Sequence, residues 1–249
     1  MWLFCYNTSM RLDKLLANSG YGTRSEVKDL LRHGRVSLNG EVIRDPGFSV
    51  TEEMKGSITL DGEPIEASEY LYFCLNKPDG YLTAMTDDRL PCVGDLLPPQ
   101  LKTKKISPVG RLDYHTTGVL LLTNDGDLSH RLTSPKFHRE KSYLVTYSGD
   151  ELTDKEKELF AGGMTLMEKG HAPEKLKPAK LEILPDHKCR LILTEGKTHQ
   201  VKRMIASTGR SVEALHRERI GTLTLKDGQL PGEMYALTEE DIRLLKDNY

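Results

Sequence analysis

The sequence of 249 residues predicts an α+β protein with two domains. Residues 10–50 carry two helix patterns followed by a hairpin pattern, which together form a small module. From residue 70 onward, short apolar segments of strand length follow one another with few helices between them, which favours a mixed or antiparallel sheet. We therefore expect a small domain with its linker at residues 10–69 and a larger sheet domain at residues 70–249.

Two helices open the small domain. Leu12, Leu15 and Leu16 have the spacing of one helix face. Thr23 and Glu26 form a capping-box pattern, because the threonine hydroxyl can accept an early helix N–H while the glutamate reaches back. The second helix is therefore predicted to begin directly after residue 23.

A hairpin is predicted after these helices. Asn39 and Gly40 separate the apolar residues 36–38 from residues 42–43, and Asn-Gly is a strong hairpin signal because both turn positions need positive φ. Residues 51–69 are acidic and turn-rich, with a second hairpin tip at residues 61–62. The exposed positions of the small domain carry the basic residues Arg11, Lys14, Arg24, Lys28, Arg32 and Arg35.

The larger domain contains five segments with strand character and four with helix character. The predicted strands are residues 71–75, 119–123, 142–147, 180–184 and 189–195. The predicted helices are residues 128–133, 153–162, 198–208 and 239–247. Residues 76–80 contain proline and glycine and are predicted to form a turn.

Several classes of protein are excluded by composition. No apolar run approaches the roughly 20 residues that span a bilayer, so no membrane partner is expected. Residues 1–9 are too short and lack the basic start of a secretory signal, and we expect a disordered extension there. The four cysteines are scattered without metal-ligand spacing, which favours a reducing cytoplasm and no metal site.

The formal net charge of −2 at first argues against a nucleic-acid partner. The charge is unevenly distributed, however. Residues 101–141 contain eight Lys and Arg against four Asp and Glu, and residues 188–219 contain eight against three. Because binding depends on a local basic face rather than on the total charge, a nucleic-acid partner remains compatible with this sequence.

Asp113 is the first candidate for chemistry. It lies in residues 110–126, between two glycines, Gly110 and Gly118, and directly before an apolar strand. A carboxylate beside such an apolar wall can act as nucleophile or base if a cation keeps it ionised. The alternative is a structural aspartate that caps a turn or pairs with Arg111.

Residues 195–204 provide the cations. Lys197, His199, Lys202 and Arg203 crowd around the start of a predicted helix, whose dipole also favours anions. Helical spacing places His199, Lys202 and Arg203 on nearly one face. This face is either a solvated basic surface or a phosphate-binding site that also supplies a partner for Asp113.

Two further segments are basic or aromatic near strands. Tyr143 lies on a predicted strand, where it either belongs to the core or stacks on a base. Residues 215–221 (Leu-His-Arg-Glu-Arg-Ile-Gly) are basic and close to a strand. The chain contains no Gly-rich phosphate loop and no nucleophile-elbow serine, so no cofactor is expected.

These segments, in this order, resemble the motifs of the bacterial RNA pseudouridine synthases. The matching segments are residues 76–80 (Asn-Lys-Pro-Asp-Gly), 110–126, 141–145 (Lys-Ser-Tyr-Leu-Val) and 195–204, with Val119 standing where the family usually has leucine. Residues 195–204 and 213–221 are most similar to the branch that modifies small-subunit ribosomal RNA. The opening module resembles an RNA-binding domain shared with a small-subunit ribosomal protein, and the whole resemblance covers residues 10–245.

The resemblance implies a role for each candidate residue. Asp113, Tyr143 and Lys202 would be catalytic, with Lys202 as the partner of the aspartate and Arg203 as second choice. The substrate-binding residues would be Arg111, Leu215, Lys77, His199, Arg203 and Arg217. The basic residues of the small domain would bind RNA, and the enzyme would act as a cytoplasmic monomer without a cofactor or metal.

The implied reaction isomerises a uridine to pseudouridine, with 16S ribosomal RNA or a subunit assembly intermediate as the substrate. The target base would be flipped from its stack and held by Tyr143 and Leu215. The pair between Asp113 and Lys202 is expected to be buried, so removal of Lys202 would harm folding as well as rate. The alternatives are a large-subunit enzyme of the same family, a non-catalytic ribosome-assembly factor, and a hydrolase that uses Asp113 with His115 or His199.

Overall fold

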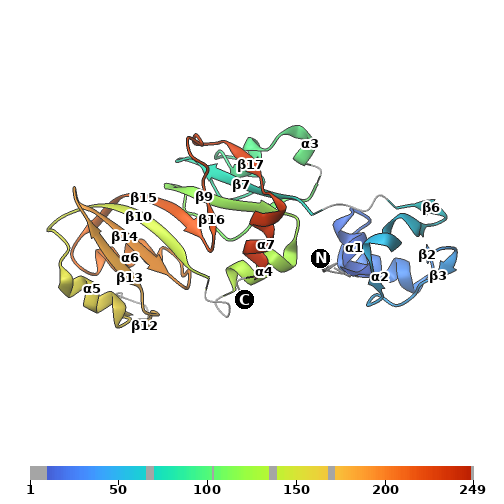
Figure 1. The fold of residues 1–249 in the computed structure, drawn as a ribbon, viewed down its shortest axis with the longest axis horizontal. Coiled ribbons are helices and arrows are strands. Elements are labelled where there is room, and N and C mark those ends of the chain that lie inside the picture. The colour runs from blue at the N-terminus through green and yellow to red at the C-terminus, as the bar shows by residue number, and fades with distance from the viewer. Residues whose placement is uncertain (1–9, 66–69, 103, 135–138, 168–171, 248–249) are drawn as a thin grey trace, which may run out of the picture. The chain divides into compact units, whose positions relative to one another are not determined.

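The computed structural model describes residues 10–65, 70–102, 104–134, 139–167 and 172–247. The chain divides into two compact units, one comprising the chain up to Tyr70 together with residues 103–105, and the other comprising residues 71–102 and 106–249 (Figure 1). The expected disordered extension at residues 1–9 lies outside the described residues. Within the described ranges, no helix has the length and apolar character needed to cross a membrane.

The first unit consists of two helices and small antiparallel sheets. Its elements are β1 (Met10–Arg11), α1 (Leu12–Asn18), α2 (Arg24–Arg32), β2 (Val36–Leu38), β3 (Glu41–Val42), β4 (Ser49–Val50), the 3-10 helix η1 (Glu52–Ser57), β5 (Ile58–Leu60) and β6 (Glu63–Pro64). Strand β1 pairs with β4, and the other four strands form a sheet in the order β3-β2-β5-β6. Leu12, Leu15 and Leu16 of α1 are fully buried and pack with Val27 and Leu31 of α2, as their spacing predicts.

The local signals of the first unit are confirmed. Thr23 caps α2, with its backbone N–H donating to Glu26 at 2.7 Å and its hydroxyl accepting from the Glu26 N–H at 3.3 Å. Asn39 and Gly40 have φ values of 50° and 86° between β2 and β3, as a tight hairpin turn requires. The second predicted tip, residues 61–62, connects β5 to β6.

The second unit is built on one nine-stranded mixed sheet. Its strands are β7 (Tyr72–Lys77), β8 (Ser107–Pro108), β9 (Thr116–Thr123), β10 (Lys141–Ser148), β13 (Lys180–Leu184), β14 (Lys188–Leu193), β15 (Ser211–Ile220), β16 (Leu223–Thr224) and β17 (Met234–Ala236). A separate two-stranded sheet pairs β11 (Thr165–Leu166) with β12 (Glu174–Lys175). The helices are η2 (Val93–Leu96), α3 (Pro99–Lys102), α4 (Gly126–Thr133), α5 (Asp154–Ala161), α6 (Gln200–Ala206) and α7 (Glu239–Asp247).

The main sheet runs in the order β13-β14-β10-β15-β9-β7-β17, and the β9–β15 pair is parallel whereas the other pairs are antiparallel (Figure 1). The predicted α+β class with a mixed sheet is therefore confirmed. The parallel pair requires close approach, because a Cβ on Gly118 (φ +102°) would lie 2.3 Å from the Arg217 carbonyl oxygen. Glycine at position 118 therefore lets β9 lie against the middle of β15.

Some predicted boundaries were wrong. Residues 76 and 77 end strand β7 instead of forming a turn, so the turn begins at Pro78. The strand predicted at residues 119–123 begins earlier, at Thr116, and that predicted at residues 189–195 ends at Leu193. Strand β15, which contains the basic residues 215–220, was not predicted at all.

Candidate active site

Asp113 lies in the loop that precedes β9, and hydrogen bonds hold this loop on two sides. The Leu112 N–H donates to Thr83 Oγ1 at 3.1 Å, and this hydroxyl donates back to the Leu112 carbonyl at 2.6 Å. The Thr116 N–H donates to the Asp113 carbonyl at 3.0 Å, which closes the turn around Asp113. The backbone of Asp113 is therefore fixed before any substrate arrives.

Lys77 supports the same loop from below. Its side chain is fully buried, and Nζ donates to the carbonyls of Pro78, Tyr114 and Thr116 at 2.9–3.1 Å. Burial lowers the pKa of Lys77 to about 8, against the smaller opposing effect of nearby Asp79 and Asp113. The structure thus makes Lys77 a support for the Asp113 loop and does not bring it to the surface of the cavity, contrary to the expected substrate contact.

Two basic side chains of the 195–204 segment reach Asp113. Lys202 Nζ lies 3.4 Å from one carboxylate oxygen, and His199 Nε2 lies 3.5 Å from the other. The side chains of Asp113 and Lys202 are 31% and 36% exposed. The expectation of a buried pair was therefore wrong, and the damage to folding expected from loss of Lys202 shrinks to that of a partly exposed ion pair.

Arg203, the second choice for this role, faces elsewhere. Its guanidinium pairs with Glu174 at 2.7 Å, and Lys197 pairs with the same carboxylate at 3.2 Å. Helix α6 begins at Gln200 rather than at residue 198, because His199 has a left-handed conformation with φ 50°. That conformation separates His199 from the helix while leaving its ring beside Asp113.

Helix α6, which carries Lys202, is anchored at its start by buried polar groups. Gln200 Nε2 donates to Glu195 Oε1 at 2.7 Å, and the Lys197 N–H donates to Gln200 Oε1 at 2.9 Å. Both Gln200 and Glu195 are buried. These bonds fix the direction in which the first turn of α6 leaves the sheet.

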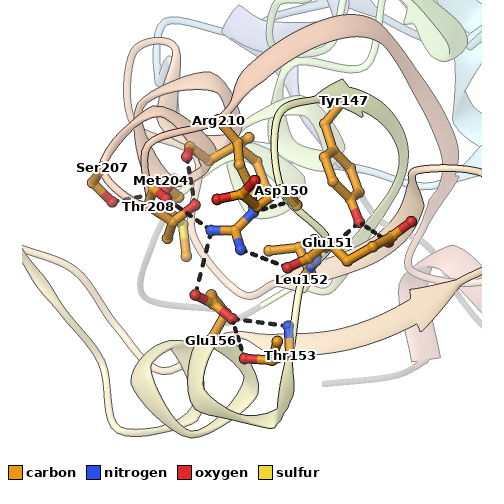
Figure 2. Close-up of polar contacts among 11 residues, drawn as sticks. Tyr147, Asp150, Glu151, Leu152, Thr153, Glu156, Met204, Ser207, Thr208 and Arg210 are labelled. Atoms are coloured by element: carbon orange, nitrogen blue, oxygen red, sulfur yellow. Dashed lines mark hydrogen bonds and ion pairs between the residues drawn. The ribbon is translucent and has the colours of Figure 1, made fainter.

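The chain beyond α6 is anchored by Arg210 (Figure 2). Arg210 Nε donates to the Asp150 carbonyl, Nη1 to the Thr208 carbonyl and Nη2 to the Glu151 carbonyl, each at 2.7 Å. Nη1 also contacts Glu156 at 3.3 Å. Every guanidinium nitrogen therefore has an acceptor, and the chain after α6 is tied to the loop between β10 and α5.

A cavity of about 150 Å³ opens beside Asp113. Residues from β10, β15 and β9 line it together because these three strands are neighbours in the sheet. Arg217 of β15 is the register partner of Tyr143 on β10 and of Gly118 on β9. Tyr143 and Leu215 are 9% and 6% exposed and supply apolar wall. Of the nine predicted catalytic and substrate-binding residues, those lining the cavity are Asp113, Tyr143, Arg111, Leu215, His199 and Arg217.

Thr116 and Lys141 are among the cavity residues to which the sequence assigned no role. Thr116 is the first residue of β9 and lies three positions after Asp113. Lys141 lies two positions before Tyr143 on β10, so the alternation of strand side chains could have placed it on the same face. Burial lowers the pKa of Lys141 to about 8, with a smaller contribution from the charge of Arg217.

The geometry does not favour the hydrolase alternative. His115 pairs with Asp79 at 3.0 Å, and neither residue lines the cavity. Among the described residues that line the cavity, Asp113 is the sole carboxylate, whereas glycosidic hydrolysis commonly needs two. The described residues likewise contain no cluster of three His, Cys, Asp or Glu suited to a metal ion.

Three of the six basic residues predicted to bind RNA are in ion pairs within the first unit. Arg11 pairs with Asp13 at 2.9 Å, Arg32 with Asp29 at 2.8 Å, and Arg35 with Asp61. Lys14 lies over the Tyr70 ring at 5.6 Å. Arg24, Lys28 and Arg32 are exposed at four-residue intervals along α2 and therefore form one basic ridge.

The matches to known families join an enzyme domain to an RNA-binding domain. Residues 71–207 match the family described as RNA pseudouridylate synthase, and residues 10–55 match the S4 domain. The first match covers more than half of the chain, and the chain belongs to the RNA pseudouridylate synthase family. It is therefore an isomerase, and the class inferred from its motifs is confirmed.

Similar proteins span the same length. The ribosomal small subunit pseudouridine synthase A of Escherichia coli K12 is 42% identical over 94% of this chain and 98% of its own. An uncharacterised RNA pseudouridine synthase of Bacillus subtilis is 42% identical over 96% of this chain and 99% of its own. A crystal structure of a pseudouridylate synthase matches with a TM-score of 0.66 and 40% identity, covering 95% of this chain and all of that one.

Proposed function

We propose that this enzyme converts one uridine of 16S small-subunit ribosomal RNA to pseudouridine, with Asp113 as the essential residue. The observation that carries this proposal is the position of Asp113. Its carboxylate lies between Lys202 and His199, at a cavity whose apolar wall is made by Tyr143 and Leu215. The 42% identity to small-subunit enzymes over nearly the whole chain supports the choice of RNA.

The target base must leave its stack to reach a recessed carboxylate. Tyr143 then holds the flipped uracil by stacking, and Leu215 packs on its other side. Asp113 acts as the nucleophile at the sugar or the base, or removes a sugar proton, while Lys202 keeps it oriented. The base is rejoined through carbon-5 without net redox change, so the reaction requires no cofactor.

The first unit supplies affinity for RNA in this proposal. The ridge of Arg24, Lys28 and Arg32 contacts phosphates, and each lost contact lowers the slope of log affinity against log salt by about 0.7–0.9. Substitution of all three by glutamine should flatten that slope while single-turnover rates at saturating enzyme remain unchanged. Arg35→Gln is the control, because Arg35 lies after α2, outside the ridge, and pairs with Asp61. An unchanged slope in the triple variant contradicts this role.

The decisive experiment maps pseudouridines in ribosomal RNA from cells with and without this protein. One 16S position should lose its modification and regain it with the wild-type protein but not with Asp113→Asn. Loss of a large-subunit position instead would favour the alternative enzyme of the same family. A modified site that the Asp113→Asn variant restores would contradict the role of Asp113, and release of free uracil would indicate a hydrolase.

We place the enzyme in the cytoplasm, where its proposed substrate is made, and expect a monomer that acts on bare 16S RNA or on an assembly intermediate. Sedimentation of the purified protein tests whether it is a monomer. Comparison of naked 16S RNA with partly assembled subunits tests which of the two is the substrate. A stable dimer, or equal inactivity on both substrates, would contradict these assignments.

A further inference from the structure

Two buried polar atoms at the cavity have no hydrogen-bond partner among the described residues. They are Thr116 Oγ1 and Arg217 Nη2, on residues that are 1% and 3% exposed. An unsatisfied buried donor costs free energy, so native proteins retain few of them. Both residues line the same cavity as Asp113, which makes a ligand in that cavity the natural partner.

The sheet holds the two residues in fixed positions. Thr116 is the register partner of Leu215 in the parallel β9–β15 pair, and Arg217 is the partner of Gly118. Arg217 Nε donates to the Val119 carbonyl at 2.8 Å, which anchors the guanidinium and leaves Nη2 for another acceptor. Thr116 belongs to the turn closed by its own N–H on the Asp113 carbonyl. Both residues line the cavity, but their two unpaired atoms are covered by neighbouring atoms, so a ligand reaches them only when those neighbours shift.

The charge around the cavity indicates the polarity of that ligand. The residues that line the cavity include the basic residues Arg111, Lys141 and Arg217, and Asp113 is the one carboxylate among the described lining residues. Such a surface favours a ligand with an electron-rich edge that becomes more negative during the reaction. A uracil ring has two carbonyl oxygens and gains negative charge when it separates from its sugar.

We propose that Arg217 and Thr116 bind the carbonyl edge of the flipped uracil, and that Arg217 stabilises the negative charge on the detached ring. This inference rests on the proposed function, because it requires a uridine in the cavity. Arg217 Nη2 donates to one ring carbonyl oxygen, and the Thr116 hydroxyl bonds a second polar atom of the ring.

The bonds and charges balance without a further reactant. The N1–C1′ bond breaks and its electron pair passes to the ring, where it is shared with the two carbonyl oxygens. The ring turns, carbon-5 forms a bond to C1′, the proton on carbon-5 leaves, and N1 takes up a proton. Arg217 acts most strongly on the detached ring, so its loss should lower the single-turnover rate more than RNA affinity.

Thr116 provides a matched pair of variants. Thr116→Val keeps the shape and removes the hydroxyl, whereas Thr116→Ser keeps the hydroxyl and removes a methyl group. The valine variant should react about tenfold more slowly, as expected for one lost hydrogen bond, and the serine variant should stay close to wild type. Equal loss in both variants would indicate a packing role and overturn the assignment of Thr116.

Arg217 is tested with RNA that carries 2-thiouridine or 4-thiouridine at the target, because sulfur is a weaker acceptor than oxygen. Arg217→Lys should react about 10–100-fold more slowly than wild type with unchanged RNA affinity. One of the two thio-substrates should slow the wild type about tenfold but slow Arg217→Lys no further. A thio penalty that is equal in both proteins would overturn the contact with Arg217.

A control variant on the same strand shows whether a change in the thio penalty is specific to Arg217. Arg219→Lys changes the same strand, β15, at a residue that pairs with Glu140 and does not line the cavity, so it should keep wild-type thio penalties. If Arg217→Lys does not fold, the same cycle with Thr116→Val carries the test. The test uses any RNA that the wild type converts, so failure on 16S RNA would overturn the proposed substrate without deciding the present inference.

Discussion

Two arginines of the second unit, Arg210 and Arg217, show how a structural polar cluster differs from the proposed binding site. Both are buried, at 9% and 3% exposure. Arg210 has an acceptor for each guanidinium nitrogen and joins two segments of backbone (Figure 2). Arg217 donates to the Val119 carbonyl, and its buried Nη2 has no partner within the part of the chain that the structure describes. Burial alone does not separate the two roles, whereas hydrogen-bond saturation does.

The largest expected effect is a loss of activity, and it concerns the cavity that Arg217 shares with Asp113. Asp113→Asn should lower pseudouridine formation by about 10⁴-fold or more, the range seen when a reacting side chain is removed. Thermal stability should barely change, because the carboxylate is partly exposed. Tritium release from uridine-labelled RNA measures the rate, and Asp79→Asn, which removes an exposed carboxylate outside the cavity, is the control. A loss far smaller than this in Asp113→Asn would refute its essential role.

The Arg210 cluster, in which each guanidinium nitrogen has an acceptor, should instead affect stability. Arg210→Met leaves three carbonyls and Glu156 without their donor, and should lower the free energy of unfolding by about 3 kcal/mol. Urea denaturation followed by circular dichroism measures the loss. Arg190→Met is the control, because Arg190 is 34% exposed and its pairs with Glu182 and Glu218 are worth less. Equal losses would break the distinction between the regions.

Lys202 lies between the two extremes, since it touches Asp113 but remains 36% exposed. Lys202→Met should slow the reaction by about 10²-fold, because the carboxylate loses its orientation. Its cost to stability should stay below about 1 kcal/mol. Single-turnover kinetics and a urea melt on the same preparation separate the two effects. Lys202→Arg is expected to recover part of the rate. A loss of stability without a loss of rate in Lys202→Met would contradict the role of Lys202 in orienting Asp113.

The smallest expected effect is on the pH dependence of the free energy of unfolding, and it measures the cost of burying the Lys141 ammonium beside the cavity. The pKa of Lys141 falls from 10.5 to about 8 on folding, so between these values the unfolded chain binds more protons and stability rises with pH. Lys141→Met should remove about 1 kcal/mol of the rise between pH 7 and 9. Lys77, whose pKa burial also lowers to about 8, contributes a further part of the rise.

Chemical denaturation at pH 7, 8 and 9 checks this prediction. Measurement stops at pH 9 because burial raises the pKa of Cys74 and Cys189 from 9.0 to about 11. These thiols make the stability of the folded protein fall with pH above that point. Identical pH profiles for wild type and Lys141→Met would show that the Lys141 ammonium bears no burial cost.

Local features were predictable from sequence because their causes are local. The capping box at Thr23 and the Asn39-Gly40 turn depend on residues within three positions of each other. Strand β15 was missed because charged residues interrupt its apolar pattern. Their partners, such as Arg190 for Glu218 and Glu140 for Arg219, come from other parts of the chain.

The candidate site shows the same division. Asp113 and Tyr143 were found from their motifs, and both line the cavity. The motif ranked Lys202 before Arg203 by position alone, and the structure separates these two residues of α6 by their partners, Asp113 and Glu174. Nor could it place Lys77, whose acceptors become neighbours through the pairing of β7 with β9.

The parallel pairing of β9 with β15 also sets the order in which this enzyme matures. The bond from Arg217 to Val119 joins residues 98 positions apart, and closing such a separation delays contacts during folding. The ribosome releases the Asp113 loop long before it releases β15. A nascent chain that ends before residue 211 carries the aspartate but lacks Leu215 and Arg217. The cavity beside Asp113 is therefore completed only once synthesis of the sheet is almost finished.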